Sequence, residues 1–224
     1  MKKIVTKFGG SSLADAGQFR KVRDILMMDP ARCYVVPSAP GKRFKEDTKV
    51  TDLLYRLHRQ TAAGEDTTAT REAILGRYTG IRDELQLEVR IEDELEKVFA
   101  AVAAGASSDY TASRGEYLNG ILLAAFLGWR FMDAASVVYF DERGVFDPEK
   151  TNVVMMALLA DGVPTVVPGF YGAMPDGSIH TFSRGGSDIT GAIVSRAVRA
   201  DAYENWTDVS GFLMADPRLV ENPR

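Results

Sequence analysis

The segment that decides the fold reads KIVTKFGGSS and spans residues 3–12. Its β-branched residues predict a short strand, and its two glycines let the backbone turn sharply so that N–H groups approach an anion. Ser11 and Ser12 offer hydroxyl donors and are expected to cap the helix that follows. Lys7 ends the strand and carries a positive charge toward the same anion. The segment therefore predicts a phosphate site at the end of a strand.

The alternative interpretation of this segment is a plain strand, a tight turn and a surface lysine, and the segment alone does not separate the two. The spacing to a Gly-Lys-Ser/Thr ending is absent, so the segment is not a Walker loop. A third glycine at the right offset is also absent, so it is not a dinucleotide fingerprint.

The composition of the chain argues against several classes of protein. The 224 residues suffice for one large domain or two modest lobes with a sizeable core. A net charge of −4 gives no support to a nucleic-acid partner. The single cysteine, Cys33, excludes an internal disulfide framework, and we expect it to fill the core. With no apolar run of spanning length, we expect no membrane partner and a cytoplasmic location.

Two histidines and no Cys/His cluster argue against a transition-metal site. We therefore expect no metal ligated by dedicated side chains, and any metal to be a hard cation held by oxygens and phosphate.

Strand patterns alternate with helical ones along the chain. This alternation predicts an α/β sandwich with a mostly parallel sheet and helices on both faces, and ligands beyond the carboxyl ends of the strands. A densely charged segment, residues 42–49, lacks apolar periodicity and is expected to be a mobile loop that closes over the ligand. Strands are expected at 33–36, 131–132, 137–140, 163–167 and 202–206, and helices at 15–28, from 51 onward, 68–104 in pieces, 108–127, 151–160 and 189–198.

A second glycine-rich turn covers residues 183–188, SRGGSD, and again precedes a helix. Arg184 supplies a planar fork suited to a carboxylate or a phosphate. Asp188 falls in the first turn of the helix. The alternative is that Asp188 interacts only with the helix dipole while Arg184 is a surface charge.

Further polar clusters follow other strands or lie on a helix. Thr207 and Asp208 suit a ribose or a hydrated cation, although two consecutive turns would also explain them. Glu116, in the run Arg114-Gly115-Glu116, could bind the ammonium of a substrate if it is buried. The alternative is that it belongs to a solvated helix face. Single hydroxyls are weaker candidates, because such groups cap helices in many proteins.

Taken together and in this order, the motifs resemble those of aspartate kinases, within the amino acid kinase superfamily. The residues that carry the resemblance span the whole chain and are KFGGSS at 7–12, Ser38-Ala39, Arg114-Gly115-Glu116, RGGSD at 184–188, Thr207-Asp208 and Asp216-Pro217-Arg218.

The resemblance implies a three-layer α/β/α fold and transfer of the ATP γ-phosphoryl group to the side-chain carboxylate of L-aspartate, with Mg²⁺. That reaction gives 4-phospho-L-aspartate and begins lysine, threonine and methionine biosynthesis. The implied catalytic residues are Lys7 and Asp188. The implied substrate-binding residues are Ser38, Thr51, Glu116, Arg184 and Gly185. The implied phosphate- and nucleotide-binding residues are Gly9, Gly10, Ser11, Thr207, Asp208 and Arg218.

Two departures from the family pattern bear on this assignment. Ser183 stands where many relatives have glycine, and the chain ends at Arg224, where the family's catalytic domain continues. We therefore expect residues 1–224 to be a catalytic domain with a complete aspartate-binding part and a truncated nucleotide lobe, without the regulatory ACT domains. The full-length enzyme is expected to be a homo-oligomer. The alternatives are a kinase acting on glutamate or acetylglutamate, and a non-catalytic aspartate-binding fragment.

Overall fold

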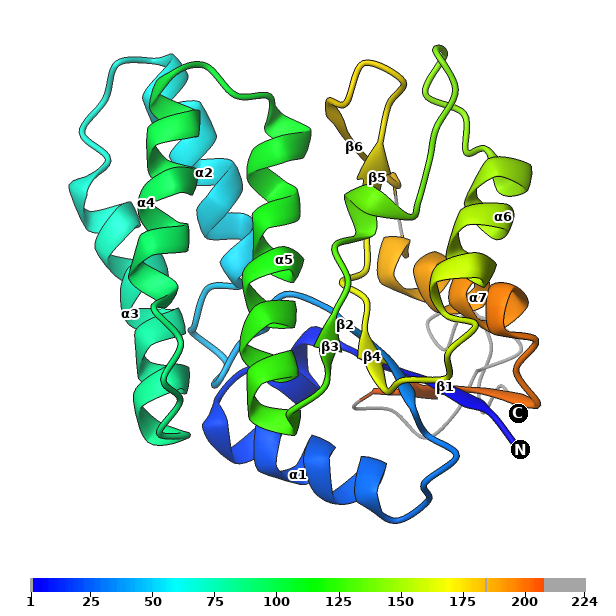
Figure 1. Ribbon diagram of the computed structural model, residues 1–224. Helices are drawn as coiled ribbons and strands as arrows, with labels where there is room; N and C mark the ends of the chain where they lie inside the picture. Colours follow the sequence, from blue (N-terminus) through cyan, green and yellow to red (C-terminus); the bar gives the residue numbers. More distant parts are fainter. Residues whose placement is uncertain (1, 184, 208–224) are drawn as a thin grey trace, which may run out of the picture.

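The computed structural model of the protein describes residues 2–183 and 185–207 (Figure 1). Three of the residues implied by the resemblance, Arg184, Asp208 and Arg218, therefore lie outside the described residues.

A parallel sheet forms the centre of the molecule. Its strand order is β3-β4-β2-β1-β7, and every neighbouring pair is parallel, as predicted. Strand β1 (Ile4–Phe8), which lies between β2 and β7, is buried along its whole length. The other strands of this sheet are β2 (Tyr34–Pro37), β3 (Arg130–Phe131), β4 (Thr165–Val166) and β7 (Ala202–Trp206).

Helices cover both faces of the sheet, which confirms the three-layer α/β/α sandwich (Figure 1). Alternate residues of β2 point to opposite faces. Val35 packs in a cluster with α1 (Ala16–Met27) and α5 (Ser108–Leu127). Tyr34 and Val36 pack in a second cluster with α6 (Pro148–Leu158) and α7 (Gly186–Val198).

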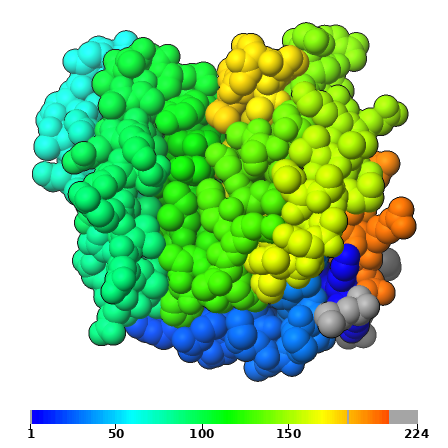
Figure 2. All heavy atoms as spheres, viewed as in Figure 1, coloured from blue at the N-terminus to red at the C-terminus, as the bar shows by residue number. Residues whose placement is uncertain are grey.

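Three more helices extend the first of these layers into a helical block beside α5. They are α2 (Val50–Ala62), α3 (Thr68–Glu84) and α4 (Ile91–Ala103). Their apolar faces continue the cluster that contains Val35, so the block shares the core of the sheet. In the space-filling view of Figure 2 this block, in cyan and green, stands beside the yellow and orange α/β part.

A small hairpin lies outside the central sheet. Strands β5 (Tyr171–Ala173) and β6 (Ile179–Thr181) are antiparallel and flank the Pro-Asp-Gly turn at 175–177. The expected strand at 137–140 is wrong. The side chain of Asp133 accepts from the amide of Ala135 and caps a 3₁₀ helix, η2 (Ala134–Ser136), so the following residues form only isolated bridges.

The expected cap of the first helix is also wrong. Ser11 and Ser12 lie inside a 3₁₀ helix, η1 (Gly10–Leu13), and Asp15 caps α1 by accepting from the amide of Gln18 at 2.9 Å. Helix α2 begins at Val50, one residue before its expected start at Thr51. Among the described residues, no helix is long and apolar enough to cross a membrane.

Candidate active site

Gly9, Ser38 and Thr207, the residues that follow three neighbouring strands, lie at the carboxyl end of the sheet. They come together there because β1 pairs in parallel with β2 on one side and β7 on the other. Backbone bonds continue past the strands: the amide of Ser38 donates to the carbonyl of Phe8 at 3.1 Å, and that of Gly9 to the carbonyl of Trp206 at 3.1 Å. Motifs far apart in the sequence thus form one surface.

A pocket of about 560 Å³ opens at this surface. Most of the implied site residues that the structure describes line it: Gly9, Gly10, Ser11, Ser38, Thr51, Glu116 and Thr207. The remainder of the wall is the segment 39–45 together with Lys49. The pocket therefore combines glycine amides, hydroxyls and basic side chains with one buried carboxylate.

Lys7 and Asp188 form an ion pair beside this pocket. The ammonium Nζ of Lys7 lies 2.9 Å from Oδ1 of Asp188, and the Lys7 side chain is buried while that of Asp188 is half exposed. Asn205 Nδ2 donates to the same oxygen at 3.0 Å. A Cβ built on Gly9 would lie 3.8 Å from Lys7 Nζ, so the charge lies directly behind the first glycine loop.

The second glycine turn brings Asp188 to this place. Gly185 has a φ of 60°, a left-handed conformation that glycine adopts without strain, and it is the N-cap residue of α7. Helix α7 consequently begins at Gly186, three residues earlier than expected, and Asp188 lies in its first turn. The carboxylate thus faces both Lys7 and the positive end of the helix dipole.

Glu116 is the acidic side chain of the pocket. Only 6% of the residue is exposed, and its Oε2 has no hydrogen-bond partner among the described residues. Burial raises the pKa of Glu116 to about 8, and the backbone amide of Ala39 partly opposes this shift. A buried carboxylate of this kind is suited to a cationic partner, because an ammonium would restore its hydrogen bonds and stabilise its charged form.

Gly115 allows Glu116 to reach the pocket. A Cβ at Gly115 would lie 2.8 Å from the Cβ of Ala39 and 3.3 Å from Leu54 Cδ1. The absence of that atom lets α5 approach the loop after β2 closely. The carbonyl of Gly115 also accepts from the hydroxyl of Tyr78 at 2.8 Å, which ties α5 to α3.

Arg114, the first residue of the Arg-Gly-Glu run, has a different environment. Its guanidinium lies over the rings of Tyr110, Tyr117 and Tyr171, at 4.8, 4.4 and 5.1 Å from their centroids. The residue is buried and lies outside the pocket lining. It packs the core between α5 and β5 through cation–π contacts.

Cations gather on the wall formed by the loop after β2. Lys42, Arg43, Lys45 and Lys49 all line the pocket, whereas Glu116 is the acid in that lining. Four cationic side chains and one carboxylate in the lining favour a mainly anionic ligand that carries one cationic group. Among residues 2–183 and 185–207, no group of three or more His, Cys, Asp or Glu side chains is placed to hold a metal ion.

Sequence reasoning missed three residues that shape the pocket. Gly41 donates its amide to the carbonyl of Gly10 at 2.8 Å, and a Cβ there would lie 2.5 Å from the Gly10 carbonyl carbon. Asn119 Nδ2 donates to the carbonyl of Ser38 at 2.6 Å. Asn205 binds Asp188, as described above. In the sequence, the Pro-Gly pair at 40–41 indicates a turn, and Asn119 is one of several polar residues on a largely apolar helix. Asn205 gave no signal.

Comparison with known proteins identifies the family of this chain. The family model described as the amino acid kinase family matches residues 2–224. The chain belongs to the amino acid kinase family. Within it, the chain is 39% identical to Aspartokinase 3 of Bacillus subtilis over 98% of its own length and 52% of that protein's.

Solved structures in the same family are also similar to the chain. Aspartate kinase of Clostridium acetobutylicum superposes with a TM-score of 0.93 at 52% identity, covering all of this chain and 52% of the other. E. coli aspartokinase III, solved with aspartate and ADP, superposes with a TM-score of 0.83 at 27% identity over 99% of this chain and 52% of its own. The chain thus spans about half the length of the relatives it matches, and the expected resemblance to aspartate kinases is confirmed.

Proposed function

We propose that the protein is an aspartate kinase, which transfers the γ-phosphoryl group of ATP to the side-chain carboxylate of L-aspartate. The observation that carries this proposal is the buried Glu116 in the pocket, with one oxygen lacking a hydrogen-bond partner among the described residues and a predominantly basic wall around it. An amino dicarboxylate matches that arrangement, because its ammonium pairs with Glu116 while its carboxylates meet the cations. Similarity to aspartokinases supports the same substrate.

Ser38 and Thr51 line the pocket with Glu116, and we assign them to the substrate. Gly185 and Arg184 belong to the turn before Asp188. We assign Arg184 to the α-carboxylate of aspartate, as the resemblance implies. This role stays a prediction because Arg184 lies outside the described residues.

The chemistry needs no general base, because a carboxylate is already a nucleophile at neutral pH. It needs relief of the repulsion between two anions as charge spreads over the phosphoryl oxygens. We assign this role to Lys7, whose ammonium is held in a buried position by Asp188. Asp188 then acts as an organising residue that fixes the direction of that charge.

The first glycine loop is assigned to the phosphates of ATP. The amide of Gly9 already donates to Trp206, so we assign phosphate binding mainly to Gly10 and Ser11, at the start of η1. Gly9 has no side chain and so lets the backbone approach the phosphates closely. Thr207, with Asp208 and Arg218 beyond the described residues, is assigned to the nucleotide.

Mg²⁺ fits this site as an ion carried mainly by the nucleotide. Asp188 supplies one half-exposed carboxylate, and the described residues hold no cluster of metal-binding side chains. When bound, the ion would neutralise phosphate charge. Every other step in the proposal uses groups of the chain itself.

We assign residues 1–224 to an amino acid kinase catalytic domain that contains the aspartate-binding part. Assembly into a homo-oligomer and a cytoplasmic location stay predictions.

A substrate panel tests the proposal. The full-length enzyme is assayed for ADP release with aspartate, glutamate and acetylglutamate, and aspartate is expected to give the highest kcat/KM. Faster turnover with glutamate would refute the choice of substrate. Calorimetry with Mg²⁺-ATP and aspartate, each alone, separates an enzyme from a fragment that binds only aspartate.

A further inference from the structure

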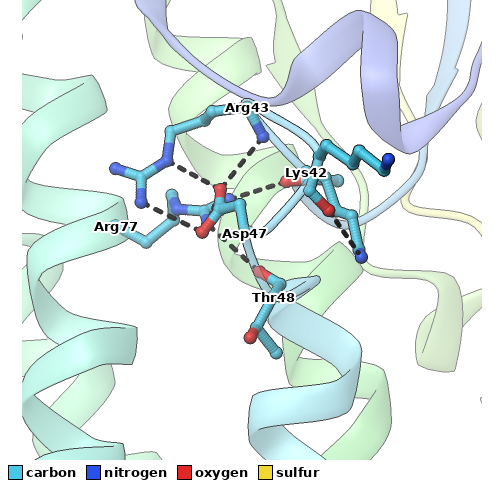
Figure 3. Close-up of polar contacts among 7 residues, drawn as sticks. Lys42, Arg43, Asp47, Thr48 and Arg77 are labelled. Carbon is cyan, nitrogen blue, oxygen red and sulfur yellow. Dashed lines mark hydrogen bonds and ion pairs between the residues drawn. The ribbon is translucent and has the colours of Figure 1, made fainter.

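An arginine outside the pocket lining supports the loop that forms its basic wall. Arg77 lies on α3, and only 5% of the residue is exposed. Its guanidinium reaches the segment that joins β2 to α2. Nη1 donates to the carbonyl of Gly41 at 2.7 Å, and Nη2 donates to Oδ2 of Asp47 at 2.6 Å and to the carbonyl of Thr48 at 3.1 Å (Figure 3).

These acceptors lie at the two ends of the charged segment. Gly41 lies just before the charged residues and Thr48 lies near their end. The guanidinium of Arg77 therefore links the start of the segment to its end. We call residues 41–48 the basic strap. A guanidinium can make these bonds simultaneously because its donors point outward in one plane. The charged segment that the sequence predicted as a free lid is therefore attached at its base.

Asp47 extends the same network into the strap. Its carboxylate accepts from Nε and Nη2 of Arg43 at 2.8 and 3.1 Å and from the backbone amide of Arg43 at 3.0 Å. Hydrogen bonds from Arg43 lower the pKa of Asp47 well below its usual range, and Arg77 adds to this shift. The carboxylate of Asp47 thus stays ionised. It lies between the guanidinium groups of Arg43 and Arg77 (Figure 3).

The same network contacts Gly10 in the first glycine loop through Gly41. The carbonyl of Gly41 accepts from Arg77, and the amide of the same residue donates to the carbonyl of Gly10 at 2.8 Å. Two flanking cations of the strap, Lys42 and Lys45, line the pocket, and Lys42 Nζ donates to the carbonyl of Lys45 at 3.2 Å. Moving the strap would therefore displace both the basic wall and Gly10.

We propose that Arg77 is a positioning residue that holds the basic strap as a preformed wall of the aspartate pocket. Burying an arginine costs free energy unless its donors are paired, and within the described part of the chain the acceptors of Arg77 all lie on the strap. Removing the guanidinium leaves the strap without its connection to α3. The inference concerns the loop geometry directly, and only its effect on aspartate affinity depends on the proposed function.

Trypsin provides a test that does not require turnover, because the strap carries its own cleavage sites at Lys42, Arg43 and Lys45. The full-length Arg77→Met variant is compared with wild type, and cleavage is located by mass spectrometry. We expect cleavage in the strap to accelerate at least about tenfold, because the rate follows the population of the locally open form. The matched control is Arg82→Met, since Arg82 is also on α3 but pairs with Asp83 and Glu92.

Kinetics provide the second readout. For Arg77→Met we expect the KM for aspartate to rise about tenfold while kcat stays within about threefold, because ground-state positioning is lost. Arg77→Lys keeps the charge without the fork and is expected to restore little of this affinity. Arg82→Met is expected to leave both constants unchanged.

The outcomes separate this proposal from the proposed function. Wild-type cleavage in the strap of a folded Arg77→Met variant would overturn the proposal, whatever the substrate is. Faster cleavage in an enzyme inactive on aspartate would support it while refuting the proposed function. If Arg77→Met does not fold, Asp47→Asn is expected to release the strap, because it removes the negative charge and one of the two acceptor oxygens that Arg43 and Arg77 use. Unchanged cleavage in that variant would overturn the proposal as well.

Discussion

Lys7 and Asp188 lie 2.9 Å apart, between Nζ and Oδ1, although they come from the first strand and the last helix of the described chain. The approach depends on the parallel pairing of β1 and β7, which also brings Asn205 to the same carboxylate. Asn205 thus fixes the carboxylate that holds the buried ammonium of Lys7, so the ammonium keeps its position when a second anion arrives. The arrangement is therefore preorganised for stabilising a transferring phosphoryl group.

Lys7→Ala in the full-length enzyme should lower kcat much more than it weakens aspartate binding. The charge acts mainly while the phosphoryl group moves, so we expect a fall in kcat of at least about 100-fold with a small change in aspartate affinity. Steady-state kinetics and calorimetry measure the two quantities. Lys2→Ala, at an exposed lysine before the same strand, serves as control. Turnover near that of wild type would remove Lys7 from the mechanism.

Asn205→Ala should reduce turnover without abolishing it. The variant removes one of the two donors to Asp188 Oδ1 and leaves the ion pair with Lys7. Loss of a hydrogen bond to a charged group is worth about 1.5–3 kcal/mol, so kcat is expected to fall roughly 10- to 100-fold. The KM for aspartate should stay close to wild type. A larger change in KM than in kcat would contradict a role limited to orienting Asp188.

Glu116 should make stability depend on pH. Its pKa is about 8 in the folded state, above its usual 4.5, so the folded protein binds more protons than the unfolded chain between these values. Stability is therefore lost as pH rises through that window. Each pKa unit corresponds to about 1.4 kcal/mol, so Glu116→Gln should exceed wild type at pH 9 by on the order of a few kcal/mol.

Chemical denaturation of both proteins at pH 5 and pH 9 measures this difference, which should shrink at pH 5. Saturating aspartate should narrow it at pH 9 for wild type only, because its ammonium stabilises the ionised Glu116. Equal stability of the two proteins at pH 9 without ligand would count against the buried, unpaired carboxylate. Glu72→Gln, at an exposed residue of α3, controls for the loss of charge.

Gly115→Ala should destabilise the protein and weaken aspartate binding together. Its Cβ would lie 2.8 Å from the Cβ of Ala39, so the loop after β2 and α5 must separate. Overpacking of this kind costs roughly 1–3 kcal/mol. Gly76→Ala on α3 is the matched control: no atom lies within 4 Å of the added Cβ, and the change should stabilise by about 0.5–1 kcal/mol. Thermal denaturation measures the stability of both variants, and aspartate titration measures their affinity. Equal stability and equal affinity in the two variants would contradict the prediction.

The sequence by itself determined the parallel α/β sandwich and most of the residues around the pocket. Apolar and β-branched runs indicate strands that are buried on both faces, and parallel strands place the loops that follow them at one edge. For this reason Gly9 and Thr207, which follow strands, were candidates from local patterns, whereas Ser38 came from the resemblance to aspartate kinases. The start of α7 was misplaced because the left-handed Gly185 lets the helix begin within the glycine turn.

Only the tertiary structure decided which side chains support that pocket. Arg77, Asn119 and Asn205 act through bonds to residues distant in the sequence, and each is an ordinary polar residue within a regular helix or strand. Arg114 and Glu116 are separated by one residue, yet one is enclosed by tyrosine rings and the other faces the pocket. Local periodicity specifies which face of an element is buried, whereas the partner on the other side depends on how the whole chain packs.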